Sequence, residues 1–256
     1  MFIDSHCHLD FSEFDCNRQQ LIQQCHAKGI NHFIVPGVSL AQSQALLSFV
    51  TNHPSVRIAA GLHPYFLADH QEHHLSNLFD FAKQQQHQLV AIGECGLDRS
   101  IDNIDKQIRL FEAQIELANQ VSLPLIVHHR QSHDLIAQSF KRCKPQCGGV
   151  IHAFSGSQQQ ASYYIKQGFK LGVGGVISYS RAHKTRTTIA AIDTAHLVLE
   201  TDAPSMPLSG SQGQVNTPLR LLDVFAELLS LKELKKEHEH QLAAQLYQSC
   251  LEVFRI

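Results

Sequence analysis

Short apolar segments alternate with helical segments eight times along this chain. Apolar runs of this length, bounded by turn residues, are typical of parallel strands that are buried on both faces. Strands are predicted within residues 1–10 and at 32–37, 56–61, 89–93, 124–128, 149–152, 169–173 and 197–202. Helices are predicted at 17–28, 40–51, 72–86, 104–121, 134–142, 158–167, 185–192, 218–230 and 239–254. An eightfold β/α alternation predicts an α/β fold, a single (β/α)₈ TIM barrel with an extra C-terminal helix.

The length of the chain and its first strand both favour a barrel over an open doubly wound sheet. The chain has 256 residues, and one such barrel needs roughly 250. An open sheet would more often show a glycine-rich phosphate fingerprint after its first strand. Here the first strand leads into His6-Cys7-His8 instead. Because no linker or low-complexity tract interrupts the pattern, residues 1–256 are predicted to form one domain.

Charge and cysteine content restrict the possible partners and the compartment. With 21 Lys and Arg against 23 Asp and Glu, the net charge is −2, which is not the basic footprint of a protein that grips nucleic acid by electrostatics alone. A substrate that carries phosphate would have to be held by metal ions or a few basic residues. The seven cysteines form no C-x-x-C pair. Without a signal peptide or a long apolar run, they predict reduced thiols in a cytoplasmic protein with no membrane segment.

Imidazoles and carboxylates stand at the carboxyl ends of six predicted strands, where barrels of this kind place their catalytic groups. Strand alternation would project His6 and His8 to the same side and turn Cys7 away. Any one of these side chains is more often a satisfied polar residue than a ligand, but so many in register indicate a metal site. The residues are His6, His8, His63, Glu94, His128, His152 and Asp202.

This set exceeds the four ligands of one structural zinc and suits two divalent metal ions with a bridging carboxylate. Glu94 is the candidate bridge. One ion would be completed by His6, His8 and Asp202, and the other by His128 and His152. Mixed imidazole and carboxylate ligands suit Zn, Mn, Fe or Co, and Mg less readily, so the residues do not distinguish these metals.

Six motifs that carry these residues resemble the TatD family of metal-dependent deoxyribonucleases and hydrolases, which belongs to the amidohydrolase-like barrels. They are Asp4-Ser5-His6-Cys7-His8-Leu9-Asp10, Gly61-Leu62-His63-Pro64, Gly93-Glu94-Cys95-Gly96-Leu97-Asp98, Val127-His128-His129-Arg130, His152-Ala153-Phe154-Ser155-Gly156-Ser157 and Glu200-Thr201-Asp202-Ala203-Pro204. Residues 210–214 and the bases Arg181, Lys184 and Arg186 look closest to the YjjV-like branch. The resemblance implies that His6, His8, Glu94, His128, His152 and Asp202 bind divalent metals, in agreement with the set at the strand ends.

The expected function is metal-dependent hydrolysis of phosphodiester bonds by a metal-activated water, with DNA as the favoured substrate and partner. Asp202 and Glu94 are the predicted catalytic residues, and Asp202 can also take the proton of the attacking water. His63 and Arg130 are predicted to contact substrate. For His63 the alternative is bracing the loop beside Pro64, and for Arg130 it is a salt bridge to a neighbouring loop carboxylate. The bases Arg181, Lys184 and Arg186 follow the seventh strand, where barrels often bind phosphate, although at least two of them are expected to be solvated.

Two other functions are compatible with the same residues. A phosphotriesterase-like or lactonase-like hydrolase of a small molecule is the first. Many such barrels bridge their metals with a carboxylated lysine from the fourth strand, but residues 90–94 contain no lysine. The second is a metal-binding barrel without catalysis, which the open two-metal ligand set disfavours.

Overall fold

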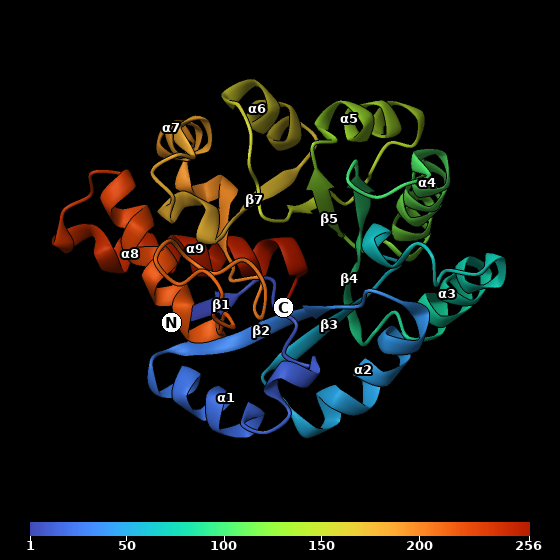
Figure 1. Cartoon of the computed structure of the whole chain (residues 1–256), viewed down its shortest axis with the longest axis horizontal. Helices are drawn as coiled ribbons and strands as arrows, with labels where there is room; N and C mark the ends of the chain where they lie inside the picture. Colours follow the sequence, from blue (N-terminus) through green and yellow to red (C-terminus); the bar gives the residue numbers. More distant parts are fainter. The chain divides into compact units, whose positions relative to one another are not determined.

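The computed structural model describes residues 1–256, in which eight strands alternate with helices (Figure 1). The strands are β1 (Phe2–Asp4), β2 (Ile30–Pro36), β3 (Val56–Ala60), β4 (Leu89–Asp98), β5 (Leu125–Arg130), β6 (Gly149–Ile151), β7 (Phe169–Val173) and β8 (Leu197–Leu199). The helices are α1 (Arg18–Ala27), α2 (Leu40–Asn52), α3 (Glu72–Gln84), α4 (Ile104–Val121), α5 (His133–Arg142), α6 (Gln158–Lys166), α7 (His183–Ala191), α8 (Leu221–Leu231) and α9 (Glu239–Phe254).

The strands form one sheet in chain order, from β1 to β8. The described pairs are parallel, as in β5 and β6, where Leu125 is opposite Gly149. Parallel strands that follow one another in this way require a crossover helix between them, and each connection from β1 to β8 contains one. The predicted (β/α)₈ fold class is therefore confirmed, and α9 is the expected extra C-terminal helix.

Three strands differ in length from the prediction. Strand β4 continues through Glu94 to Asp98, because its ladder with β5 extends to the pair Asp98 and Arg130. In contrast, β1 ends at Asp4 and β8 at Leu199. The predicted strand through His8 and the predicted strand through Asp202 are both too long, because loop backbone takes over the hydrogen bonding there. His8 N, for example, donates to the carbonyl of Ala203.

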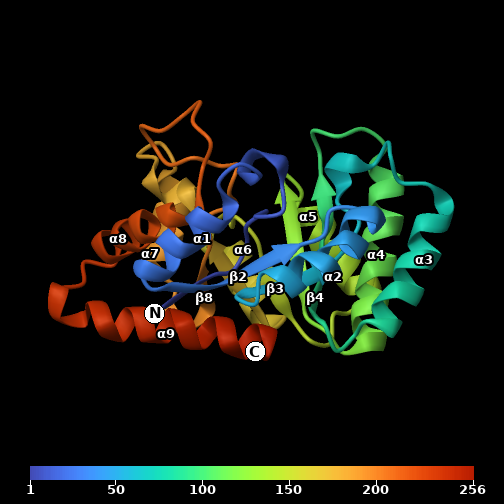
Figure 2. The ribbon, with the colours of Figure 1, turned by 90° about the horizontal axis from the view of Figure 1, so that it is seen from below.

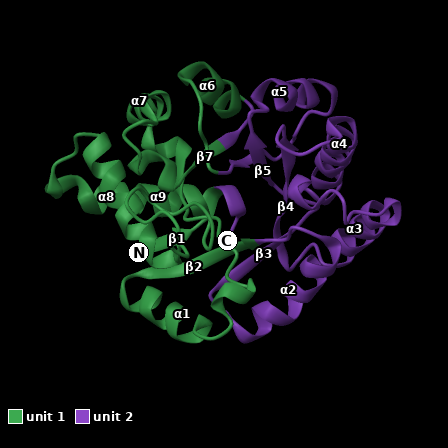
Figure 3. Cartoon of the chain, in the orientation of Figure 1, with its two compact units in different colours: residues 1–35, 153–166, 170–252 green, residues 36–152, 167–169, 253–256 purple.

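The chain divides into two compact units (Figure 3). Unit 1 contains residues 1–35, 153–166 and 170–252, and unit 2 contains residues 36–152, 167–169 and 253–256. In unit 1, Phe2 packs edge-on against Phe225 of α8, with the ring centres 4.9 Å apart. In unit 2, Phe140 stacks on Phe169 at 5.1 Å. Each unit thus has its own aromatic packing, and the single-domain assignment stays a prediction.

Within unit 1, helix and loops occupy opposite sides of the strands. The segments that follow β1 and β8 extend to the top of Figure 2, whereas α9 lies along the bottom. Leu242, Leu246 and Cys250 of α9 are buried, so this helix covers the side away from the loops that carry the predicted ligands. No helix has both the length and the apolar composition that a membrane crossing requires.

Candidate metal sites

Three predicted ligands of unit 1 lie close together, and we call them the histidine-pair cluster: His6, His8 and Asp202. The Nε2 atoms of the two histidines are 3.3 Å apart. Asp202 Oδ1 lies 3.6 Å from each of them. The two imidazoles lie side by side, as predicted. Strand alternation does not explain their proximity, since β1 ends before His6. Both histidines are buried.

The buried carboxylate of Asp4 fastens the segment that carries His6 to the segment that carries Asp202. It accepts hydrogen bonds from the backbone N–H of Thr201 at 3.0 Å and from its hydroxyl at 2.6 Å. It also accepts one from the backbone N–H of His6 at 3.3 Å. Burial raises the pKa of Asp4 to about 7, although these hydrogen bonds lower it. In addition, the N–H of Asp202 donates to the carbonyl of His6 at 2.9 Å.

Asn216 holds the loop that follows Asp202. Its side-chain N–H₂ donates to the carbonyls of Thr201 and Ser205, both at 2.8 Å. Its backbone N–H donates to the carbonyl of Pro204 at 3.0 Å, and the residue is buried. The sequence analysis did not select Asn216. A polar residue just before the Thr217-Pro218 helix start resembles ordinary capping, and the contacts with residues 201–205 come from the tertiary structure.

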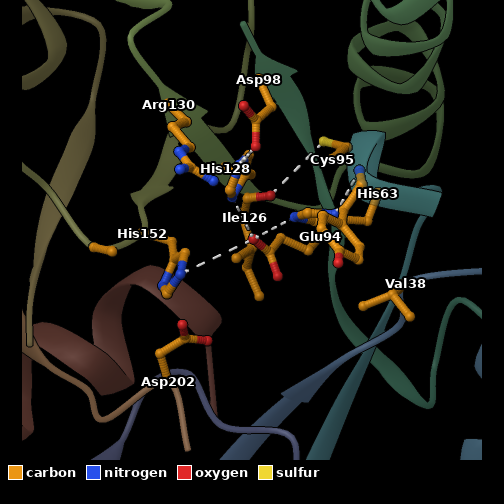
Figure 4. Close-up of polar contacts among 12 residues, drawn as sticks. Val38, His63, Glu94, Cys95, Asp98, Ile126, His128, Arg130, His152 and Asp202 are labelled. Atoms are coloured by element: carbon orange, nitrogen blue, oxygen red, sulfur yellow. Dashed lines mark hydrogen bonds and ion pairs between the residues drawn. The ribbon is translucent and has the colours of Figure 1, made fainter. Parts of the chain in front are cut away.

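A second group of predicted ligands lies in unit 2, and we call it the Glu94 cluster: His63, Glu94, His128 and His152 (Figure 4). Glu94 Oε1 lies 3.1 Å from His63 Nε2, 3.2 Å from His128 Nδ1 and 4.0 Å from His152 Nε2. His152 directly follows β6, and its N–H donates to the carbonyl of Val127 in β5. The structure therefore gathers the imidazoles of three strand ends around one carboxylate oxygen.

Asp98 orients the ring of His128. Its Oδ2 lies 3.3 Å from His128 Nε2, while the Nδ1 atom of that ring faces Glu94. Burial lowers the pKa of His128, but the hydrogen bonds to Asp98 and Glu94 outweigh this effect and raise it to about 9. Burial alone would raise the pKa of Asp98, yet the bonds from His128 and Ser100 hold it well below its usual range. A carboxylate behind a ligand histidine is the usual support of metal sites.

His63 is fixed between the backbone of its own loop and Glu94. Its Nδ1 accepts a hydrogen bond from the N–H of Tyr65 at 3.0 Å. A neutral imidazole whose Nδ1 accepts must carry its proton on Nε2, and Nε2 faces Glu94 Oε1. Burial lowers the pKa of His63, against the opposing effect of Glu94. This geometry makes His63 a hydrogen-bond donor to Glu94 that also braces the β3 loop.

Two buried glutamines of α4, which the sequence analysis missed, hold the strand ends of unit 2. Gln107 accepts from the N–H of Asp98 at 2.8 Å and donates to its carbonyl at 3.0 Å. Gln114 accepts from the N–H of Leu62 at 2.8 Å and donates to its carbonyl at 3.2 Å. Their spacing of seven residues places them on one face of the helix. The polar character of two residues on the inner face of α4 was the signal that could have identified them.

Close backbone approach explains one glycine of the motifs. A Cβ atom on Gly61 would lie 2.6 Å from the carbonyl oxygen of Glu94, which is too close for any other residue. The cysteines beside the ligands are packing residues. Cys7 and Cys95 are fully buried, and burial raises the pKa of both thiols.

The donor atoms of both clusters fit divalent metal ions. Ligand atoms about 2.0–2.1 Å from a tetrahedral ion lie about 3.3–3.4 Å from one another. The three edges of the histidine-pair cluster measure 3.3, 3.6 and 3.6 Å. His63, Glu94 and His128 form a group with metal-ligand spacing in unit 2. Imidazole nitrogens and carboxylate oxygens are also the right donors for Zn, Mn, Fe or Co.

The predicted basic residues have different environments. Arg130, at the end of β5, is exposed. Asp134, a nearby carboxylate in the first turn of α5, pairs instead with Arg99 at 2.7 Å. Arg186 donates to the carbonyl of Ile177 and lies 3.7 Å from Glu227, which is a structural role. Lys184 is exposed, and Arg181 lies over the ring of Tyr179.

Residues 3–255 match the family model described as TatD related DNase. The uncharacterized metal-dependent hydrolase YjjV of Escherichia coli K12 is 39% identical to the chain, and the alignment covers 100% of the chain and 98% of that protein. The 3′-5′ ssDNA/RNA exonuclease TatD of Erwinia tasmaniensis is 30% identical over 77% of each protein.

The solved structures include one that matches the whole chain. The crystal structure of YjjV, a TatD homologue from E. coli K12, superposes with a TM-score of 0.94 at 38% identity. The superposition covers 100% of the chain and 98% of that structure. This match bears out both the family resemblance and the fold class that the sequence predicted.

Proposed function

The chain belongs to the TatD family of metal-dependent hydrolases, and on this premise we propose that it is a nuclease that cleaves phosphodiester bonds of DNA. The observation that carries the proposal is that carboxylate oxygens and imidazole nitrogens lie 3.2–3.6 Å apart in both units, the spacing of donor atoms that share one ion. A relative named as a 3′-5′ ssDNA/RNA exonuclease supports a nucleic-acid substrate.

We assign the six predicted metal ligands to two divalent ions. His6, His8 and Asp202 would hold one, and His128 and His152 would hold the other. Glu94 is the proposed bridge. His63 is not a ligand in this proposal, because its Nε2 proton is directed to Glu94 and its Nδ1 is occupied by the N–H of Tyr65.

Bound ions would lower the pKa of a coordinated water and offset the charge that develops on the phosphate oxygens. The side chain of Asp202 is 14% exposed, so one of its carboxylate oxygens can accept the proton that the attacking water loses. The proton of His63 Nε2 holds Glu94 in a fixed orientation. Asp98 does the same for His128 from the far side of the ring.

Arg130 is the proposed contact for the substrate phosphate. Its guanidinium is exposed at the end of β5, two residues after His128, and the neighbouring Asp134 is engaged by Arg99. A free guanidinium can hold two oxygens of one phosphate. This local contact would let a chain of net charge −2 bind a polyanion, together with the charge of the metal ions. His63 remains a second proposed substrate contact, through the loop that it braces.

Turnover assays with defined metals test the proposal. The purified protein, loaded with Mn or Mg, is expected to degrade single-stranded DNA and to leave lactone and phosphotriester substrates intact. Metal analysis of the same sample should give two ions per chain. Hydrolysis of a lactone or phosphotriester without DNA cleavage would favour the small-molecule hydrolase. Failure of the fully loaded protein to turn over any of these substrates would favour a non-catalytic metal-binding protein.

A further inference from the structure

A pocket of about 300 Å³ lies within unit 1, between the segment that joins β7 to α7 and the loop that follows β8. The ribbon of the first segment is drawn in gold and that of the second in orange in Figure 1. The pocket is lined by Gly175, Val176, Tyr179, Arg181, Ala182, Met206 and Pro207. None of these residues belongs to either metal cluster.

Hydrogen bonds between the two segments build this pocket before any ligand binds. The hydroxyl of Tyr179 donates to the carbonyl of Pro207 at 2.7 Å. The N–H of Ser209 donates to the hydroxyl of Ser178 at 2.8 Å. Arg186 of α7 donates to the carbonyl of Ile177, which lies in the first of these segments. Ligand pockets in proteins are usually preformed in this way.

The chemistry of the lining is apolar with a single positive charge. Val176, Ala182, Met206 and Pro207 supply aliphatic walls, and no carboxylate lines the pocket. The guanidinium of Arg181 lies 5.0 Å from the centre of the Tyr179 ring, and Arg181 is exposed to solvent. A planar guanidinium held over a ring offers both a stacking face and donors for phosphate oxygens.

We propose that this pocket binds one nucleotide unit of a single-stranded nucleic acid, with the base between Ala182 and Met206 and the phosphate on Arg181. The inference rests on the proposed nuclease function and names how the substrate is held away from the metals. Met206 follows Asp202 by four residues on the same loop, which limits the separation of their backbones to at most about 14 Å. A strand that leaves the histidine-pair cluster can cover that length.

The test measures binding of a nuclease-resistant phosphorothioate oligonucleotide to the metal-loaded full chain by fluorescence anisotropy. Arg181→Gln removes a charge-assisted phosphate contact and is expected to weaken binding about 10-fold. Lys184→Gln is the matched control, since it removes the same charge from an exposed position three residues away. Its effect should stay below about 2-fold, as is usual for a solvated surface charge.

An abasic oligonucleotide of equal length separates a nucleotide from a plain phosphate. Ala182→Phe fills the pocket and should weaken binding of the base-containing strand about 10-fold, within the range for one lost stacking contact, and leave abasic binding unchanged. If Ala182→Phe does not fold, Met206→Ala gives the same comparison by enlarging the pocket. Equal affinities for Arg181→Gln and Lys184→Gln would overturn the proposal. An Arg181 effect without base dependence would also overturn it, because that result describes a phosphate site.

Turnover of bis(p-nitrophenyl) phosphate separates this inference from the proposed function. That substrate is too small to need the pocket, so its turnover by the metal-loaded wild-type protein reports on the hydrolytic function alone. Oligonucleotide binding that depends on Arg181, in a protein that cleaves neither DNA nor this ester, would support the pocket and refute the nuclease. DNA cleavage by a protein whose oligonucleotide binding does not depend on Arg181 would support the nuclease and refute the pocket.

Discussion

The two metal clusters are built in different ways. Two members of the Glu94 cluster, Glu94 and His128, lie on long strands, since β4 has 10 residues and β5 has 6. The ladder of these strands continues to the pair Asp98 and Arg130. The histidine-pair cluster lies beyond strands of 3 residues each. There, buried side chains add to single backbone hydrogen bonds. Asp4 accepts from Thr201, and Asn216 donates to the carbonyls on either side of Asp202. One cluster therefore depends mainly on the strand ladder, and the other depends more on a few buried polar side chains. Single substitutions should therefore affect them unequally.

Glu94→Gln is expected to have the largest effect. The amide keeps the size of the side chain but removes the charge that His63 and His128 face. Turnover should fall by at least about 10³-fold, the upper end of what one lost electrostatic stabiliser costs, and bound metal should fall with it. Steady-state kinetics and elemental analysis measure both. Glu112→Gln, a surface glutamate of unit 2 paired with Arg142, is the control. A fully active Glu94→Gln protein would refute the bridging role.

Asn216→Leu tests how strongly the histidine-pair cluster depends on buried side chains. The change removes the donors to the carbonyls of Thr201 and Ser205, so the loop around Asp202 loses these two supports. Metal affinity is expected to fall about 10–100-fold, as for other residues that orient ligands. Titration with Mn or Zn measures it. Asn119→Leu removes a comparable bridge from the last turn of α4 to Lys144 and Gln146, and should leave metal affinity unchanged. Equal affinities of the two variants would contradict the comparison.

Gln107→Leu makes the corresponding change in unit 2. It leaves the backbone N–H and C=O of Asp98 without their partner, which should cost about 1–3 kcal/mol in the free energy of unfolding. Metal affinity should fall less than about 10-fold, below the usual cost of a lost ligand support, because the ladder with Arg130 still positions Asp98. Urea unfolding and metal titration measure the two quantities, with exposed Gln86→Leu as control. A loss of metal affinity as large as that of Asn216→Leu would show that the ladder does not position this cluster.

Asp134→Asn should have the smallest effect. The hydrogen bond from Arg99 lowers the pKa of Asp134, so the stabilisation is present above the unfolded-state pKa and is lost as the pH falls through the folded-state pKa. The pair is exposed, so the difference from wild type at neutral pH should not exceed about 0.5 kcal/mol. Urea unfolding at neutral and strongly acidic pH measures it. A difference that grows on acidification would mean that the pair has the opposite linkage.

The fold was largely predictable because it depends on repetition. Apolar segments separated by amphipathic helices specify the order β1 to β8 with little regard to individual residues. Strand ends were less predictable, since β4 extends past Gly93 only because its neighbour offers partners as far as Arg130. The backbone beyond β1 likewise bonds to residues far away in the sequence, as His8 does to Ala203.

The ligands could be chosen from the sequence because imidazoles and carboxylates at strand ends indicate a metal site by their residue type alone. Their supports could not be chosen in this way. Thr201 and Asn216 are ordinary polar residues whose significance comes from contacts across the tertiary structure. Asp4 and Thr201, for example, are separated by 197 positions. Gln107 and Gln114 gave a weak signal of their role. They are amides on the buried face of α4, where aliphatic residues would normally lie.

The buried cysteines beside the ligands have a consequence for oxidative damage. Cys7 lies between His6 and His8, Cys95 follows Glu94, and neither thiol reaches solvent. Burial raises the pKa of both, and the charge of Asp4 adds to the effect at Cys7. Oxidants and alkylating reagents attack the thiolate, a form that these residues do not adopt at neutral pH. The two thiols beside the predicted metal ligands are therefore protected from oxidants such as peroxide. Cys16, which is exposed, would be modified first.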